Sequence, residues 1–318
     1  MQKIRKLHDI DWFTRPHKFR NFRIEGTVSA PFTPFKPDGE INYDVFPAYS
    51  KYLQDHHFKH AFVNGTLAEG MSQTMDERKK TVEAWMKAAD GKIGIIAHVG
   101  TNNLRDAKEL ARHAEEVGVE AIAAFAPSFY KPKDEEALVD YMVELAGAAP
   151  NTPFYYYCIN FVTGIYLNSA KFLRLAKDKI PNLCGLKHSS RELPSAHNCS
   201  LVDKDRFQVL IGSDVQFITC LSLKIEVPVT ASYLGSLFFK LKTAYDKGDM
   251  ATALQLQEKA QAVNNVRDRF GGDIPVAKKM FSIVSGVDAG PVRLPLKDIS
   301  KESEEDLRKA LMDLACWQ

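Results

Sequence analysis

Residues 154–158, Phe-Tyr-Tyr-Tyr-Cys, and residues 183–187, Leu-Cys-Gly-Leu-Lys, are two short runs of mostly apolar residues. The stretch 168–179 between them has the spacing of an amphipathic helix. A strand, a helix and a second strand in this order predict a βαβ unit, in which the two strands lie parallel. Their continuous apolar character is typical of strands that are buried on both faces.

The same alternation runs through most of the chain. Further strands are predicted at residues 24–32, 60–64, 93–99, 120–126, 207–212 and 227–232, and further helices at 43–56, 76–89, 104–117 and 134–149. Asn42, Thr74, Asn103 and Asn168 stand where helix N-caps are expected. Eight strands that alternate with helices predict an α/β fold, a closed (β/α)8 TIM barrel in preference to an open doubly wound sheet.

The predicted barrel takes up residues 24–248, and helical sequence follows at 249–269, 275–285 and 302–314. We interpret residues 249–318 as a C-terminal helical appendage of the same domain, and residues 1–23 as a basic N-terminal extension. That extension lacks the apolar core of a secretory signal, and its acidic residues and lack of serine argue against a mitochondrial presequence. A cytoplasmic location is therefore expected.

The composition excludes several classes of function. A formal net charge of +2 gives no argument for nucleic acid or a membrane surface as partner, and no apolar stretch approaches the ~20 residues that span a bilayer. Five cysteines without C-x-x-C spacing fit a reducing compartment and indicate no zinc site. The phosphate-binding glycine motifs and the zinc peptidase and hydrolase motifs are also missing, so no nucleotide or metal cofactor is predicted.

Lys187 ends its predicted strand, and active sites of such barrels lie at the carboxyl ends of the strands. Desolvation there lowers the pKa of a lysine and leaves more neutral amine, which suits Schiff-base chemistry with a ketone. The alternative is a lysine at the start of a solvated loop. Tyr157 ends the preceding strand, where it could pass protons to substrate, although a core role is the commoner one. Tyr155 shares its face, while Tyr156 points away.

The loop after strand 60–64 offers backbone N–H groups at Gly65 and the hydroxyl of Thr66, which are suitable partners for a carboxylate. An ordinary turn is the alternative. Glu69 further along is interpreted either as an acid that supports the site or as a helix cap. His56 and His60 have i, i+4 spacing without a carboxylate ligand nearby, so we expect them to be solvated and predict no metal site.

Together these positions resemble the N-acetylneuraminate lyase and dihydrodipicolinate synthase family of class I aldolases, with the vertebrate-type lyases as the nearest branch. The resemblance covers about residues 26–295 and rests on four fragments: 62–66, 154–157, 185–187 and 284–296. It implies that Lys187 condenses with the 2-oxo group of a small 2-oxo acid and that Tyr157 shuttles protons. It also implies pyruvate as product or donor, no cofactor, and a homotetramer arranged as a dimer of dimers.

The resemblance assigns substrate binding to further positions. These are Gly65, Thr66, Leu67, Ser189, Gly212, Asp214 and Ser232. The family also has a tyrosine that crosses a subunit interface. Phe129 occupies that position here, and Tyr130 beside it is the candidate interface relay.

Four positions depart from the family pattern. Leu67 and Ala231 replace residues with hydroxyl groups, Val215 replaces a glutamate, and Asn160 stands where proline is usual. Three interpretations therefore remain: a lyase for N-acetylneuraminate, an aldolase for a less hydroxylated 2-oxo acid, or a catalytically impaired barrel that serves in binding or assembly.

Overall fold

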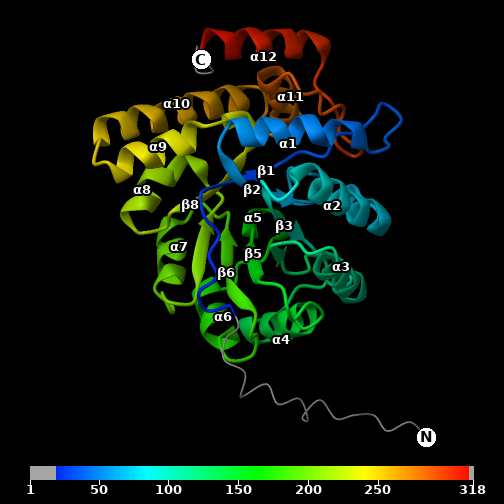
Figure 1. Cartoon of the computed structure of the whole chain (residues 1–318), viewed down its shortest axis with the longest axis vertical. Coiled ribbons are helices and arrows are strands. Elements are labelled where there is room, and N and C mark those ends of the chain that lie inside the picture. Colours follow the sequence, from blue (N-terminus) through cyan, green and yellow to red (C-terminus); the bar gives the residue numbers. More distant parts are fainter. Residues whose placement is uncertain (1–18, 315–318) are drawn as a thin grey trace, which may run out of the picture.

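The computed structural model describes residues 19–314, in which eight parallel strands close into a barrel in chain order (Figure 1). This confirms the predicted (β/α)8 fold. The strands are Thr27–Ala30 (β1), Phe58–Val63 (β2), Gly94–His98 (β3), Ala121–Ala124 (β4), Phe154–Cys158 (β5), Leu183–His188 (β6), Gln208–Ile211 (β7) and Val227–Ala231 (β8). Most of the basic N-terminal extension and the last four residues lie outside the described part.

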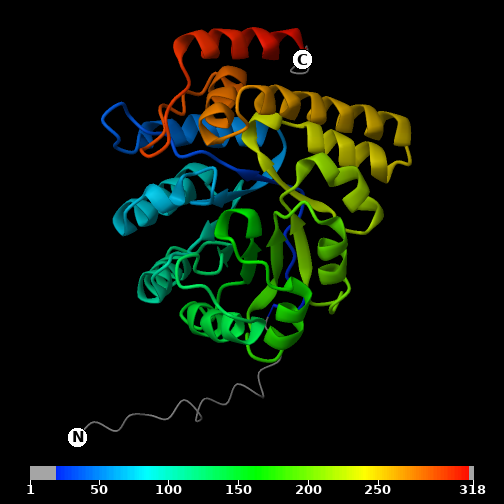
Figure 2. The same cartoon turned by 180° about the vertical axis from the view of Figure 1, so that it is seen from behind.

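Helices surround the barrel and continue beyond it. They are Phe46–Asp55 (α1), Met75–Ala89 (α2), Leu104–Glu116 (α3), Glu135–Ala146 (α4), Asn160–Thr163 (α5), Ser169–Ala176 (α6), Leu193–Ser200 (α7), Phe217–Ser222 (α8), Leu237–Asp246 (α9), Met250–Arg269 (α10), Ile274–Ser285 (α11) and Lys301–Asp313 (α12). The last of them, α12, lies farthest from the start of the described chain (Figure 2). Within residues 19–314, no helix has both the length and the apolar character to cross a membrane.

Three of the four predicted N-caps are confirmed. Thr74 forms a capping box with Glu77, and the side chains of Asn103 and Asn168 accept backbone N–H bonds in the first turns of α3 and α6. Asn42 also stands at a helix start, the N-cap position of a short 3₁₀ turn that leads into α1, but its side chain makes no capping hydrogen bond there.

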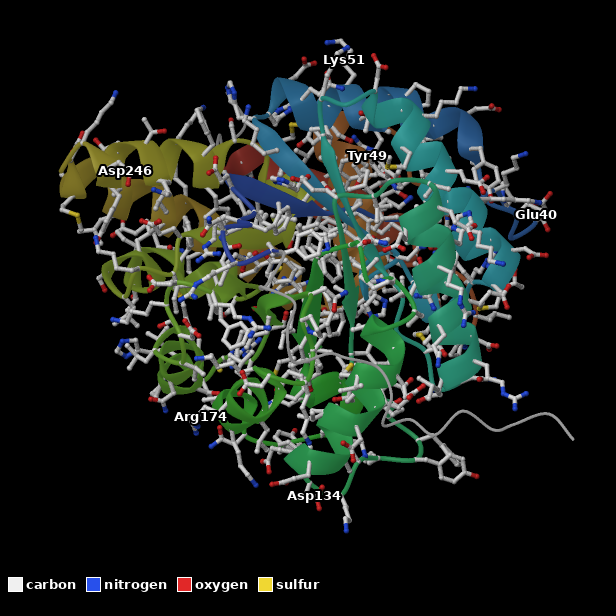
Figure 3. All side chains as sticks on the ribbon, turned by 60° about the horizontal axis from the view of Figure 1, so that its bottom comes forward. Glu40, Tyr49, Lys51, Asp134, Arg174 and Asp246 are labelled. Carbon is white, nitrogen blue, oxygen red and sulfur yellow. The ribbon has the colours of Figure 1, made fainter. Side chains whose placement is uncertain are left out.

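The buried apolar residues form two separate layers. One lies between the strands and the helices, and the smaller one fills the interior of the barrel. Tyr155 and Tyr157 belong to the interior layer, whereas Tyr156 packs outward against Phe172, as the alternation along a strand predicts. Helices show the same division (Figure 3): in α1, Tyr49 is buried while Lys51 projects outward.

The segment before β1 closes the end of the barrel at which the strands begin. The backbone of Ile24 exchanges two hydrogen bonds with the Gln208 side chain, at 3.0 and 2.8 Å, and the Tyr155 hydroxyl donates to the same side chain at 2.9 Å. Phe22 packs edge-on against the Tyr155 ring, with 6.5 Å between centroids. We call Phe22, Ile24, Tyr155 and Gln208 the barrel floor.

The two histidines of the predicted solvated pair behave differently. His56 is half-buried, and its Nδ1 lies 2.8 Å from the Tyr52 carbonyl oxygen. For His60 the prediction was wrong, because its side chain is buried and its Nε2 lies 3.1 Å from Glu120. The reason is that β2 begins at Phe58, two residues before the predicted start, which places His60 inside the strand.

Gly185 is the glycine at which β6 approaches β7 most closely. A Cβ there would lie 1.9 Å from the Gln208 carbonyl oxygen, and its φ of +149° is a conformation that other residues rarely adopt. Gly185→Ala should therefore lower the free energy of unfolding by at least ~2 kcal/mol. Urea denaturation followed by circular dichroism measures the effect.

Gly91→Ala is the matched control for that substitution. Gly91 also has a positive φ, +70°, but has no atom within 4 Å of the added Cβ. Gly91→Ala should therefore lower the free energy of unfolding by no more than the backbone strain, ~1 kcal/mol. If both variants lost the same free energy of unfolding, the close approach of β6 to β7 at Gly185 would not explain the effect.

Candidate active site

Lys187 lies inside the barrel near the carboxyl end of β6. Its side chain is buried, at 4% exposure, and its Nζ lies 3.8 Å from the centroid of the Phe62 ring and 4.2 Å from that of the Tyr157 ring. This geometry excludes the solvated alternative. Burial lowers the pKa of the Lys187 amine to about 7. A large fraction of the amine is therefore neutral, and nucleophilic, near neutral pH.

Tyr157 is the neighbour of Lys187 across the β5–β6 ladder, where the two residues are paired in register. Its hydroxyl lies 3.2 Å from the Thr66 Oγ1. Burial raises the pKa of the phenol to about 12, and the hydroxyls of Thr66 and Ser189 offset part of this rise. Tyr157 thus remains protonated at neutral pH, in contact with a second hydroxyl that can take or return a proton.

The loop after β2 is tightly folded and meets this pair at the Tyr157 hydroxyl. Asn64 has a left-handed backbone conformation, with φ of +59°, and the N–H groups of Glu69 and Gly70 donate to the carbonyls of Thr66 and Gly65. A Cβ at Gly70 would lie 2.0 Å from the Asn64 carbonyl oxygen, so only glycine fits there. The loop therefore presents Gly65 and Thr66 in one fixed arrangement.

A cavity of about 510 Å³ opens beside this loop. Its wall combines the β2 loop, the ends of β3 and β5, and the late segment 293–296; it includes Gly65, Thr66, His98, Asn102, Phe125, Ser128, Ile159, Val162, Thr163, Ile274 and Leu294. Most of the exposed surface of this wall is apolar, although polar side chains, Asn102 and Ser128 among them, interrupt it. A mainly apolar cavity with a few polar groups is typical of ligand sites.

Asp214 follows β7, and its carboxylate is held by protein groups. One oxygen accepts a bond from Thr230 Oγ1 at 3.2 Å, and the other accepts from Asn264 Nδ2 at 3.3 Å. Burial of the carboxylate raises its pKa. Asp214 thus joins β7, β8 and α10, and it does not line the cavity. Its expected contact with substrate stays a prediction.

Ser232 and Gly212 also lie among close protein contacts. The Ser232 Oγ lies 2.7 Å from both Ser29 Oγ and Tyr49 Oη, and the residue is fully buried. A Cβ at Gly212 would lie 2.2 Å from Ser189 Oγ, which shows how closely these two residues approach. The structure brings Ser189 toward Tyr157, whereas the Ser232 hydroxyl faces β1 and α1.

Two residues near the loop were missed by the sequence interpretation, Arg78 and His98. The Arg78 guanidinium donates to the carbonyls of Gly100 and His98 at 3.0 and 2.6 Å. His98 Nδ1 lies 3.1 Å from the Asn64 carbonyl, and burial, with Arg78 and Lys187 nearby, holds the pKa of His98 well below its usual value. For Arg78, the signal that was missed is its position on the buried stripe of α2, which comprises residues 78, 81, 82, 85 and 89.

Glu69 does not act as a helix cap, but it supports the loop beside the site through a buried ion pair. It makes no side-chain cap bond, and its carboxylate pairs with Lys278 of α11 at 2.9 Å. Both side chains are 2% exposed. The other carboxylate oxygen accepts the Arg293 backbone N–H at 2.8 Å, and Lys278 donates to Pro291 O at 2.6 Å. This buried pair fastens the β2 loop to the segment that forms the opposite wall of the cavity.

Phe129 and Tyr130 lie in the loop before α4 and are exposed, at 75% and 84%. Their rings meet edge to face, with 5.0 Å between centroids. Phe161, Val162 and Tyr166, around α5, are exposed as well. We call the four aromatic residues of this group, Phe129, Tyr130, Phe161 and Tyr166, the exposed aromatic rim.

Comparison with known proteins gives consistent matches over nearly the whole chain. Residues 23–314 match the dihydrodipicolinate synthetase family. The N-acetylneuraminate lyase of Rattus norvegicus is 36% identical over 303 residues, which are 93% of this chain and 94% of that protein. Among solved structures, the N-acetylneuraminate lyase of Aliivibrio salmonicida has a TM-score of 0.89 at 30% identity, covering 93% and 98% of the two chains. That of Proteus mirabilis has a TM-score of 0.87 at 31% identity, covering 92% and 98%.

Proposed function

We propose, since the chain belongs to the dihydrodipicolinate synthetase family, that it cleaves N-acetylneuraminate to pyruvate and an N-acetylhexosamine. The chain is a carbon–carbon lyase of the Schiff-base class I aldolase type. The observation that carries the proposal for its site is the buried amine of Lys187, paired in register with Tyr157, whose hydroxyl lies 3.2 Å from Thr66 Oγ1.

In the proposed mechanism, the neutral Lys187 amine attacks the C2 carbonyl of the substrate, and loss of water gives an iminium. The C4 hydroxyl then loses its proton, the C3–C4 bond breaks, and its electron pair moves into the iminium to form an enamine. Protonation at C3 and hydrolysis release pyruvate and restore Lys187. The contact between Tyr157 and Thr66 supports a role for the phenol in moving protons to and from the substrate oxygens.

The test is release of pyruvate from N-acetylneuraminate, together with trapping of a pyruvate adduct. Pyruvate with borohydride should modify Lys187, as located by peptide mass spectrometry. Lys240→Met, at an exposed position on α9, is the control and should leave trapping unchanged. Trapping at other lysines with Lys187 unmodified would refute the proposed nucleophile.

The pH dependence of trapping provides a second test of the site. Because burial lowers the pKa of Lys187 to about 7, the neutral fraction of the amine falls about tenfold per pH unit below that value. The rate of adduct formation should rise with pH up to about 7 and then level off. Cyanoborohydride trapping between pH 5 and 9 measures it, with a lysine peptide as the reference amine. A rate that continued to rise toward pH 10 would indicate a solvated lysine.

A less hydroxylated 2-oxo acid is the second candidate substrate. The outer cavity wall is mostly apolar, and Leu67, Val215 and Ala231 supply no hydroxyl or carboxylate to a sugar tail. Parallel assays with 2-oxo acids that carry shorter aliphatic tails would distinguish the two. A kcat/KM for N-acetylneuraminate of ~10⁴ M⁻¹s⁻¹ or more would remove this candidate. Any turnover that Lys187→Met abolishes would also remove the impaired-barrel interpretation, which Leu67 and Asn160 motivated.

We also propose that the protein is a cytoplasmic homotetramer, a dimer of dimers, in which the exposed aromatic rim lies at a subunit interface. The large exposure of Phe129 and Tyr130 supports such an interface, since contiguous exposed aromatic residues are uncommon on monomers. We further propose that residues 24–248 form the barrel and that residues 249–318 form a helical appendage of the same domain. Sedimentation velocity distinguishes a tetramer from a 35.7 kDa monomer.

A further inference from the structure

Arg78 is a buried, charged side chain close to the β2 loop. Its side chain is buried, at 2% exposure, and burial lowers its pKa only to about 10, so it is charged at neutral pH. Its Nη groups donate to two backbone carbonyls, and one of them also lies 3.4 Å from His98 Nδ1. Its Nε has no hydrogen-bond partner among residues 19–314. Within residues 19–314, no carboxylate lies within 4.0 Å of it.

Carbonyl oxygens satisfy hydrogen bonds, but they do not cancel a charge. A buried cation without a counter-ion is costly, and removal of its partner leaves an uncompensated charge in a medium of low dielectric constant. Lys278, another buried cation near this loop, has a counter-ion within the chain, because its Nζ lies 2.9 Å from Glu69. Arg78 therefore places an uncompensated positive charge near the β2 loop, where it would stabilise an anion bound nearby.

The position of Arg78 indicates which anion this is. Its backbone carbonyl accepts a bond from Asn64 Nδ2 at 2.9 Å, and its guanidinium holds the His98 carbonyl, whose ring in turn contacts the Asn64 carbonyl. Gly65 and Thr66 follow Asn64 directly and line the cavity. Arg78 therefore lies behind the loop that is proposed to receive the substrate carboxylate.

We propose that Arg78 is a positioning residue that supplies the buried positive charge opposite the carboxylate of the 2-oxo acid. This inference rests on the proposed function. Arg78 acts through the Asn64–Thr66 loop and through its electrostatic field, because its two Nη groups are directed to the Gly100 and His98 carbonyls. The loop supplies the direct hydrogen bonds, and Arg78 makes the location favourable for a negative charge.

The test compares pyruvate with its methyl ester, which presents the same ketone without a charge. The readout is the ratio of the two trapping rates at Lys187, measured with Arg78→Met, Arg78→Gln and Arg78→Lys. Met removes charge and donors, Gln keeps donors without charge, and Lys keeps the charge. In the neutral variants the preference for pyruvate over the ester should fall about tenfold, while Arg78→Lys should retain most of it.

A purely structural role would slow both ketones equally and leave the ratio unchanged, and this result would overturn the inference. Circular dichroism establishes which variants fold. If Arg78→Met does not, the comparison of the Gln and Lys variants decides the question. If both neutral variants fail to fold, the wild-type ratio decides the question: equal trapping rates for pyruvate and its methyl ester would reject the inference. Failure of the wild-type protein to form any adduct at Lys187 would refute the proposed function itself.

Discussion

Lys187→Met should abolish turnover and, at the same time, make the protein more stable. Without the amine no iminium forms, and we expect kcat/KM to fall by at least ~10⁴-fold. The stability gain follows because the side chain is buried against Phe62 and Tyr157 without a counter-ion within 4.0 Å among residues 19–314. Replacing a buried charge by an apolar group of similar size often stabilises by ~1–4 kcal/mol.

The stability gain should depend on pH with a definite sign. The pKa of Lys187 is about 7 in the folded protein and near 10.5 when exposed, so between these values the unfolded chain binds more protons. The free energy of unfolding of the wild-type protein therefore rises with pH across that window, as far as this group contributes to it. Below pH 7 the full destabilisation caused by burying the charged Lys187 amine is present. The difference between Lys187→Met and wild type should be largest near pH 6–7 and should shrink toward pH 10. Urea unfolding at several pH values measures it, and a constant difference would contradict the assigned burial.

Glu69→Gln should be strongly destabilising even though it changes only a few atoms. The substitution leaves the Lys278 ammonium buried without its carboxylate partner, which costs ~3–5 kcal/mol. It also weakens the bond that Glu69 accepts from the Arg293 backbone, so the cavity wall at 293–296 should loosen. We expect a lower Tm and a higher KM, because the β2 loop loses its attachment to this wall.

A double-mutant cycle separates the pair from its surroundings. Glu69→Gln combined with Lys278→Met removes both charges, and it should recover much of the stability lost in either single variant. Lys51→Met, which breaks an exposed pair with Asp55, is the control and should change stability by no more than ~0.5 kcal/mol. Additive losses in the double variant would show that the Glu69–Lys278 pair is not a unit.

The fold and the central pair of residues could be predicted because their signals are local. Lys187 and Tyr157 each stand at the end of an apolar run, and consecutive strands of a barrel are neighbours, so their pairing follows from chain order. The alternation of faces also placed Tyr155 and Tyr157 together without knowledge of the helices. The error at His60 came from a strand start two residues late, which placed a buried residue at the exposed edge of the predicted strand.

The electrostatic surroundings of the site could not be predicted in the same way. Glu69 and Lys278 are 209 positions apart, and neither the spacing nor the residue types indicate that they meet. Arg78 is charged on a helix that carries many charges, and only its phase relative to Thr81, Val82 and Trp85 reveals that it is buried. Whether such a side chain is buried depends on which face of the helix packs onto the barrel. That packing is decided by contacts between distant segments, so local sequence patterns do not reveal it.

The closed barrel floor determines an order of events. Because Phe22, Ile24 and Gln208 seal the end at which the strands begin, reactants reach Lys187 from the opposite end. The fragment bonded to Lys187 then lies deepest, and the released aldehyde must depart before the remaining imine is hydrolysed. Kinetics should accordingly be ordered, with the 2-oxo acid leaving last in cleavage and binding first in synthesis. Product inhibition by pyruvate should be competitive with the cleaved substrate, and inhibition by the aldehyde should not be.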